Sequence, residues 1–174
     1  MQKRTVGLAL AALVVLGMFA MLTAIQAQSP RGRAALTALD YEEIRQLYGR
    51  YAIGIDTGNA DMFSGVFTID ATFETPGRTV QGRKQLAELA ANQRGDAGPT
   101  NVSHVAVNII IDPSPEGATG TSNYLRVKLG LKGEPSTLIG GGLYRDTFVK
   151  TSEGWRIKKR TVQQAHSIPP AKTQ

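Results

Sequence analysis

The chain has 174 residues and no cysteine, so we expect a single domain of ordinary size and exclude disulfides and cysteine-ligated metals. Its formal net charge at pH 7 is +6. A basic chain can bind nucleic acid, but the basic run of Arg156, Lys158, Lys159 and Arg160 has one neighbouring tryptophan and lies in a predicted strand. We therefore interpret this run as a solvent-exposed strand face and expect no nucleic-acid partner.

An apolar segment with a basic start opens the chain. Lys3 and Arg4 precede the run VGLALAALVVLGMFAMLTAI, and Ala27 is a small residue suited to cleavage. This order is typical of a secretory signal peptide covering residues 1–27. The run is also long enough to span a bilayer, so an uncleaved N-terminal anchor is the alternative. In both cases the sequence predicts an exported domain, periplasmic or secreted, with membrane contact only if the segment is retained.

A first helix is predicted after a linker over residues 28–37. Asp40 is a candidate N-cap because Glu43 follows three residues later, as in a capping box. Gly58 is a natural stop. Between them apolar residues recur every three or four positions, which indicates an amphipathic helix with one buried face. These residues are Ile44, Leu47, Tyr48, Tyr51, Ala52 and Ile55.

Two shorter helices flank a strand and a turn. Asn59 can cap a short helix that runs as far as Phe67. The segment DATFETPGRTVQG, residues 70–82, alternates around a Pro-Gly pair and predicts a strand followed by a turn. The segment RKQLAELAANQRG predicts a third helix with its apolar residues facing inward, namely Leu86, Leu89 and Ala90.

Long strands are predicted after the helices, over residues 102–112, 118–133, 136–150 and 155–166, with a flexible tail over 168–174. The glycines from Gly140 to Gly142 lie inside a predicted strand, so they indicate a bulge or a sharp bend and not a phosphate loop. Helices followed by antiparallel strands are typical of an α+β domain whose helices pack on one face of a curved sheet. A strongly bent sheet of this kind would form a cone with one interior pocket.

The titratable residues indicate acid–base chemistry without a cofactor. The chain has two histidines, His104 and His166, whose separation gives no metal-ligand spacing. No phosphate-loop, dinucleotide-binding or nucleophile-elbow motif occurs. If the protein is an enzyme, we therefore expect it to use side chains alone, with no metal and no cofactor.

Asp56 stands at the end of the first predicted helix, where the helix dipole disfavours a negative charge. A protonatable partner would compensate it, and His104 is a candidate because small residues neighbour it on its strand face. The alternative for Asp56 is a carboxylate that is solvated or caps the next turn. The alternative for His104 is a core or edge histidine bonded to a backbone carbonyl. The two residues are 48 positions apart, so only the fold can bring them together.

The chain resembles the SnoaL-like family of the cone-shaped superfamily that includes nuclear transport factor two, ketosteroid isomerase and scytalone dehydratase. The resemblance covers residues 38–166 and rests on DYEEIRQLYGRYAIGIDTGNADMFSGVFTIDATF, SHVAVNIIID and LIGGGLYRDTFVKTSEGWRIKKRTV. Within the family, the spacing of Tyr51 and Asp56 is similar to bile acid 7-alpha dehydratase, and the IGID and LIGG segments are similar to hexachlorocyclohexane dehydrochlorinase. The resemblance implies a domain over residues 38–167 in which a cone-shaped sheet, antiparallel or mixed, wraps around three N-terminal helices.

The same resemblance implies roles for four residues. His104 matches the general base of the related lyases, and Asp56 matches the carboxylate that fixes the tautomer of that base and stabilises the imidazolium. Tyr51 matches a tyrosine of the substrate pocket. Phe73 falls where the relatives place an aromatic wall residue.

Two departures from the related enzymes bear on the reaction. Gln164 stands where the bile acid enzyme has an arginine, and His166, two residues further on, could in part replace it as a donor or an acid. Residues 138–140 carry no histidine, whereas scytalone dehydratase has a second catalytic histidine in that region.

The sequence leaves two functions open. The first is a cofactor-independent lyase or isomerase, similar to a dehydratase, that acts on a small hydrophobic ring compound. The second is a non-catalytic module of the same fold that binds a small ligand or dimerises. Cones of this type often pair through the outer sheet face, so we expect a homodimer, with Val105, Val107 and Ile109 on that face.

Overall fold

The computed structural model describes residues 35–92 and 101–165. The predicted signal or anchor segment, the predicted tail and His166 lie outside the described residues, so export and the role of His166 stay predictions. The homodimer is not tested by a single chain and also stays a prediction. All described residues belong to one compact unit, Ala34–Gln174. Within the described ranges, no helix is long and apolar enough to cross a membrane.

The first helix, α2 (Ala38–Thr57), begins earlier than predicted because Thr37 caps it. The Thr37 hydroxyl accepts a hydrogen bond from the Asp40 amide at 3.1 Å, and the Asp40 carboxylate accepts one from the Thr37 amide at 2.9 Å. The prediction of Asp40 as N-cap is therefore wrong, since Asp40 is the reciprocal acid of a capping box that starts at Thr37. The predicted stop is confirmed, because Gly58 has φ 64° and ends the helix in the left-handed conformation.

Two short helices follow, each close to its predicted place. The Asn59 side chain caps α3 (Ala60–Ser64) by accepting a hydrogen bond from Met62. This helix is shorter than predicted, because Phe67 already belongs to the first strand, β1 (Phe67–Thr75). Helix α4 (Arg83–Asn92) follows β2 (Arg78–Gln81) and turns its apolar residues inward as predicted, namely Leu86, Leu89 and Ala90.

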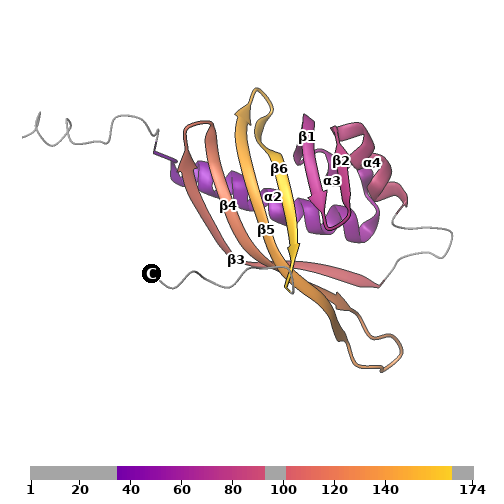
Figure 1. Ribbon diagram of the computed structural model, residues 1–174. Helices are drawn as coiled ribbons and strands as arrows, with labels where there is room; N and C mark the ends of the chain where they lie inside the picture. The colour runs from indigo at the N-terminus through magenta and orange to yellow at the C-terminus, as the bar shows by residue number, and fades with distance from the viewer. Residues whose placement is uncertain (1–34, 93–100, 166–174) are drawn as a thin grey trace, which may run out of the picture. The chain divides into compact units, whose positions relative to one another are not determined.

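Four long strands complete a single six-stranded sheet. They are β3 (Val102–Ser114), β4 (Gly117–Lys128), β5 (Thr137–Thr151) and β6 (Gly154–Gln164). The strand order is β2-β1-β6-β5-β4-β3, and the pairs are antiparallel except for parallel β1 and β6. Figure 1 shows the long strands bending past α2, with α3 and α4 beside β1 and β2. The predicted α+β fold, a curved mixed sheet with three N-terminal helices, is confirmed.

A bulge in β3 changes which residues face outward. Val107 pairs with Asn123 and Ile110 pairs with Thr121, so two residues of β3 stand opposite one residue of β4. The bulged residue Asn108 has φ 53°. Beyond it the alternation is shifted by one position. Ile109 packs against the core and Ile110 is exposed, so the prediction of Ile109 on the outer face is wrong.

A similar irregularity moves one cation of the basic run into the core. The register of β5 and β6 shifts between Thr147 and Phe148, so Ile157 and Arg160, three residues apart, are both fully buried. Lys158 and Lys159 stay outside and pair with acids of β1. The interpretation of the whole run as an exposed face is therefore wrong for Arg160.

The N-terminal end of α2 is tied to the sheet through Asp40. Its carboxylate accepts hydrogen bonds from Lys150 Nζ on β5 at 2.7 Å and from Trp155 Nε1 on β6 at 2.8 Å. The bond from Lys150, followed by those from Thr37 and Trp155, holds the pKa of the Asp40 carboxyl well below its ordinary value. The ionised carboxylate therefore favours the folded state.

We expect Asp40→Asn to lower the free energy of unfolding near neutral pH, because the amide cannot form the ion pair with Lys150. A lowered folded-state pKa gives stability that is complete above the ordinary pKa of about 4 and is lost as the pH falls through the folded-state value. The difference between wild type and variant should thus shrink below about pH 4. Urea denaturation across this pH range measures it. Asp112→Asn, an exposed acid without a described partner, is the control and should show no such difference.

Candidate active site

A cavity of about 290 Å³ opens inside the curve of the sheet. Its walls come from α2, α3, α4 and all six strands, so residues far apart in the sequence meet there. Most of the lining is aromatic or aliphatic, with a few polar side chains. The lining residues are Tyr51, Ile55, Phe63, Phe73, Thr75, Pro76, Arg78, Leu89, His104, Tyr124, Arg126, Tyr144, Val162 and Gln164.

Asp56 and His104 are in direct contact at one side of this pocket. Asp56 Oδ1 lies 2.5 Å from His104 Nδ1, and Asp56 Oδ2 accepts a hydrogen bond from the His104 backbone amide at 2.8 Å. Both side chains are partly buried. The carboxylate thus contacts both the ring and the backbone amide of His104, and the two contacts together fix the ring relative to the end of α2.

The contact determines which ring nitrogen is available for chemistry. An ionised carboxylate only accepts hydrogen bonds, so Nδ1 carries the proton that lies between the two groups. In the neutral ring the other nitrogen, Nε2, then has a free lone pair. His104 lines the pocket and Asp56 does not, so the aspartate lies behind the histidine. The arrangement can accept a proton from a molecule in the pocket while Asp56 stabilises the resulting imidazolium.

The other predicted site residues within the described ranges line the same pocket. Tyr51 and Phe73 form part of its aromatic wall, and Gln164 lies at the end of β6. The structure therefore brings the predicted residues together, and it leaves their catalytic and binding roles as predictions.

A glycine of β5 allows the backbones of β5 and β6 to approach closely beside the cavity. Gly142 pairs with Tyr124 on one side and Gln164 on the other, so it occupies the inward-facing row between two lining residues. A Cβ at this position would stand 1.9 Å from the Gln163 carbonyl oxygen. The register of β4 and β5 also shifts beside Gly140, between Arg126 and Val127, as expected for a glycine-marked bulge.

The floor of the pocket rests on an ion pair that the sequence analysis missed. Arg160 Nε and Nη2 donate to the two carboxylate oxygens of Asp146 at 2.7 and 2.8 Å, and both side chains are 0% exposed. The Arg160 guanidinium lies 4.2 Å from the ring centre of Tyr51 and 4.3 Å from that of Tyr144. Burial alone would lower the pKa of Arg160, but Asp146 more than offsets this effect and raises it, so the guanidinium stays charged.

Two tyrosines and two arginines of the lining were also missed. Tyr124 and Tyr144 stack with ring centres 4.5 Å apart. Arg78 and Arg126 reach the pocket from β2 and β4. The sequence could have indicated Tyr124 and Tyr144 only through their inward-facing positions on the strands. Those positions cannot be assigned without the pairing register of β4, β5 and β6. Burial raises the pKa of Tyr51, Tyr124 and Tyr144, so their phenols stay protonated and can donate hydrogen bonds.

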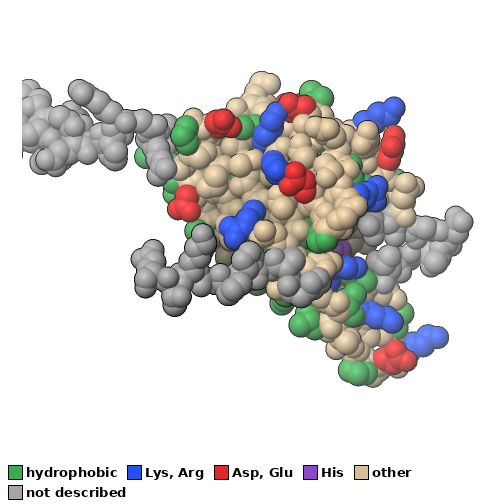
Figure 2. Space-filling model, viewed as in Figure 1, with side chains coloured by type: hydrophobic (Ala, Val, Ile, Leu, Met, Phe, Trp, Pro, Cys, Tyr) green, Lys and Arg blue, Asp and Glu red, His purple; other side chains and the backbone are tan. Residues whose placement is uncertain are grey.

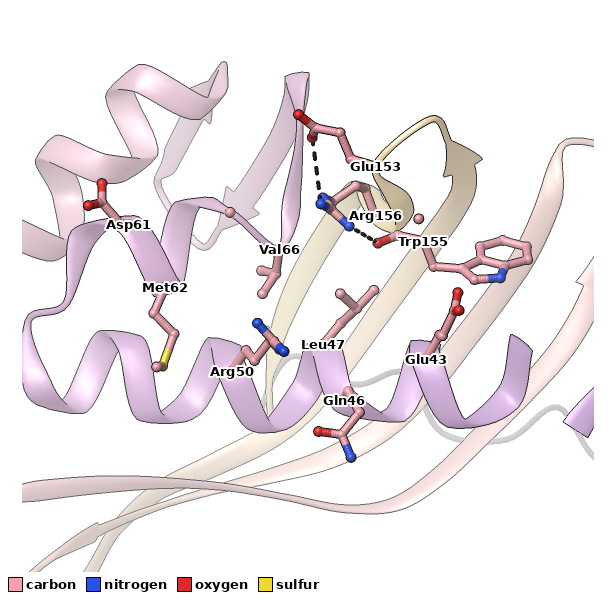
Figure 3. Close-up of a pocket in the computed structure, with 12 residues that line it drawn as sticks. Glu43, Gln46, Leu47, Arg50, Asp61, Met62, Val66, Glu153, Trp155 and Arg156 are labelled. Carbon is pink, nitrogen blue, oxygen red and sulfur yellow. Dashed lines mark hydrogen bonds and ion pairs between the residues drawn. The ribbon is translucent and has the colours of Figure 1, made fainter. Parts of the chain in front are cut away.

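A second cavity, of about 460 Å³, lies between α2, α3 and the β5–β6 turn. Figure 3 shows Leu47 and Val66 among its lining residues, together with Glu153 and Arg156, which form an ion pair. Arg156 also donates to the Trp155 carbonyl at 2.8 Å. No histidine lines this cavity, and its Glu153 carboxylate is paired with arginines, so the pocket beside His104 is the better candidate for catalysis.

A metal centre is not evident in the described part of the chain. No group of three or more histidine, cysteine, aspartate or glutamate side chains is close enough together there to hold an ion.

Family and structure comparisons agree with the fold. The model of the family described as SnoaL-like domain matches residues 36–161. A protein of unknown function from Mycobacterium tuberculosis is similar at 25% identity and TM-score 0.64, covering 74% of this chain and 77% of that one. An NTF2-like protein with a cystatin-like fold from Novosphingobium aromaticivorans is similar at 26% identity and TM-score 0.62, over 70% and 79% of the two chains.

A candidate scytalone dehydratase from Novosphingobium aromaticivorans has the same fold, at 24% identity and TM-score 0.59 over 72% of this chain and 84% of that one. No match is found among curated proteins.

We expect Asp146→Ala to lower the free energy of unfolding by about 3–5 kcal/mol, because it leaves the Arg160 guanidinium buried without its counterion. The double variant Asp146→Leu with Arg160→Met should lower the free energy of unfolding by less, since neither charge of the pair remains in the core. Guanidinium denaturation of both variants measures this.

The ion pair between Lys159 and Glu74 provides the matched control, because it lies on the same strand but on the solvent side. Glu74→Ala should cost at most about 1 kcal/mol. Equal losses for Asp146→Ala and Glu74→Ala would contradict the structural role of the buried pair.

Proposed function

The chain belongs to the SnoaL-like domain family, and on that premise we propose that its pocket catalyses a cofactor-independent lyase or isomerase reaction on a small hydrophobic ring compound. This fold family includes isomerases and dehydratases that work without a cofactor. The observation that carries the proposal is the contact between Asp56 and His104 at the wall of an aromatic pocket.

The reaction begins with proton transfer to His104 Nε2. The base removes a proton from a carbon next to an activating group, and Asp56 stabilises the charged ring that forms. In an elimination, the electron pair of the broken C–H bond forms a C=C bond and the leaving group departs with its own bonding pair. When hydroxide leaves, the imidazolium returns the proton to it and water is released. In an isomerisation, the proton returns to another carbon.

The polar side chains of the pocket supply hydrogen-bond donors for the developing negative charge. The phenol of Tyr124 stays protonated because burial raises its pKa, and Arg126 lies close enough to oppose that rise. Arg78 adds a second positive charge to the lining. Such donors stabilise an oxyanion or a departing oxygen more strongly in a pocket that excludes water than in bulk solvent.

The size of the cavity and its aromatic walls favour a compact ring compound as substrate. A volume of about 290 Å³ is at the lower end of small-molecule sites. Its aromatic walls offer flat surfaces suited to a ring. At 24% identity, the likeness to a candidate scytalone dehydratase supports the fold and does not select dehydration over the other reactions.

We expect His104→Ala to lower turnover by about 10²- to 10⁴-fold, because the proton acceptor is removed. Asp56→Asn should also lower turnover strongly, since its amide cannot stabilise the imidazolium as the carboxylate does. Ligand affinity should change much less for either variant. The measurement is a turnover screen of hydroxylated and halogenated ring compounds, followed by binding of the best ones.

Asp61→Asn is the matched control, because it makes the same chemical change at the other cavity. It should turn over substrate like wild type. Undiminished turnover in His104→Ala would contradict the proposal. Binding of ring compounds by wild type without turnover would instead favour a non-catalytic ligand-binding module.

A further inference from the structure

The hairpin that joins β4 and β5 exposes a cluster of large apolar side chains. Figure 1 shows this hairpin projecting beyond the ends of the other strands. Four of its apolar residues are between 45% and 62% exposed, namely Leu129, Leu131, Leu138 and Ile139. Isolated exposed leucines are common on protein surfaces, but a contiguous group marks a site of interaction.

The tip of the hairpin has a defined conformation. Lys132 and Gly133 have φ values of 54° and 88°, so both central residues of the turn are left-handed, as in the tight turns that join twisted strands. The turn is closed by a hydrogen bond from the Glu134 amide to the Leu131 carbonyl at 3.1 Å. The amide of Gly130 donates to Ser136 Oγ at 3.2 Å. The exposed leucines are therefore presented by a folded structure.

Cations surround these apolar side chains. Arg126 and Lys128 lie on the β4 arm and Lys132 lies at the tip, against one acid, Glu134. None of the three cations forms a hydrogen bond or an ion pair with another described residue. Figure 2 shows lysine and arginine side chains among apolar ones on the projecting part of the domain. We call the four apolar residues and these three cations the hairpin surface.

We propose that the hairpin surface docks on an anionic lipid bilayer. Leucine side chains of a projecting tip can enter the boundary between headgroups and acyl chains, while lysines beside them stay at headgroup level and meet negative charge. A second copy of the chain fits less well, because a symmetric contact would bring the unpaired cations of both copies together. The surface therefore has the apolar and basic composition of a peripheral membrane contact.

The hairpin surface continues into the mouth of the pocket beside His104. A groove at the base of the hairpin is lined by Ile139 and by Tyr124, Arg126 and Gln164. The last three also line the pocket. A docked domain would thus open its pocket toward the bilayer, and a hydrophobic compound could pass from the lipid into the site. That last step rests on the proposed function, whereas the docking does not.

The test is co-sedimentation of the unit of residues 34–174 with lipid vesicles. This unit contains the complete family domain and the whole core of the described residues, and it lacks the apolar N-terminal run, which would itself bind lipid. We expect binding to phosphatidylcholine vesicles that contain phosphatidylglycerol, weaker binding at high salt, and little binding to phosphatidylcholine alone. Lys128→Glu with Lys132→Glu should weaken binding by about tenfold or more.

Leu131→Ser with Leu138→Ser should also weaken binding. The matched control is Leu39→Ser with Ile69→Ser, because Leu39 and Ile69 are 64% and 78% exposed on other elements. Arg45→Glu with Lys84→Glu is the control for charge. Circular dichroism confirms that each variant is folded, and His104→Ala should bind vesicles like wild type even if the enzyme proposal fails.

Three results would overturn the proposal. The first is absence of binding to anionic vesicles at low salt. The second is binding that the hairpin variants and the control variants reduce equally. The third is a self-associating wild-type unit that Leu131→Ser with Leu138→Ser converts to monomers without any vesicle binding, which would assign the surface to a second copy of the chain.

Discussion

The ion pair of Arg160 and Asp146 lies in the core of the domain, with both side chains fully buried and directly opposite each other on β6 and β5. Transferring two charges from water into a core is costly, and the cost is offset only when the geometry of the pair is good. A slip of two residues between these strands would keep both side chains on the inner face and leave each charge buried without its partner. The pair therefore ties the register of β5 and β6 to the stability of the whole domain.

The pocket depends on that register. With Asp146 opposite Arg160, Tyr144 stands opposite Val162 and Gly142 stands opposite Gln164. These pairs place Tyr144, Val162 and Gln164 where all three line the pocket. The guanidinium lies beneath Tyr51 and Tyr144, so the same charge that fixes the strands also supports the rings of the floor. The cavity above it is consequently a fixed feature of the fold.

Helix α2 is held to the sheet at both ends by carboxylates. Asp40 binds Lys150 and Trp155 near its start, and Asp56 binds His104 near its end. The second contact serves the helix as well as the histidine, because an acid at the negative end of a helix dipole needs a proton donor nearby. The contact that compensates the helix end thus also fixes the position of a histidine in the lining of the pocket.

The sequence by itself determined what depends on local spacing. The apolar repeat and Gly58 defined α2, Asn59 defined the start of α3, and the alternation of apolar residues located the long strands. Two features required tertiary structure. The bulges of β3 and β6 put Ile109 and Arg160 inside, because one extra residue reverses the alternation and leaves no clear trace in composition. The approach of Asp56 to His104 joins segments 48 residues apart, and only the packing of α2 on β3 decides that distance.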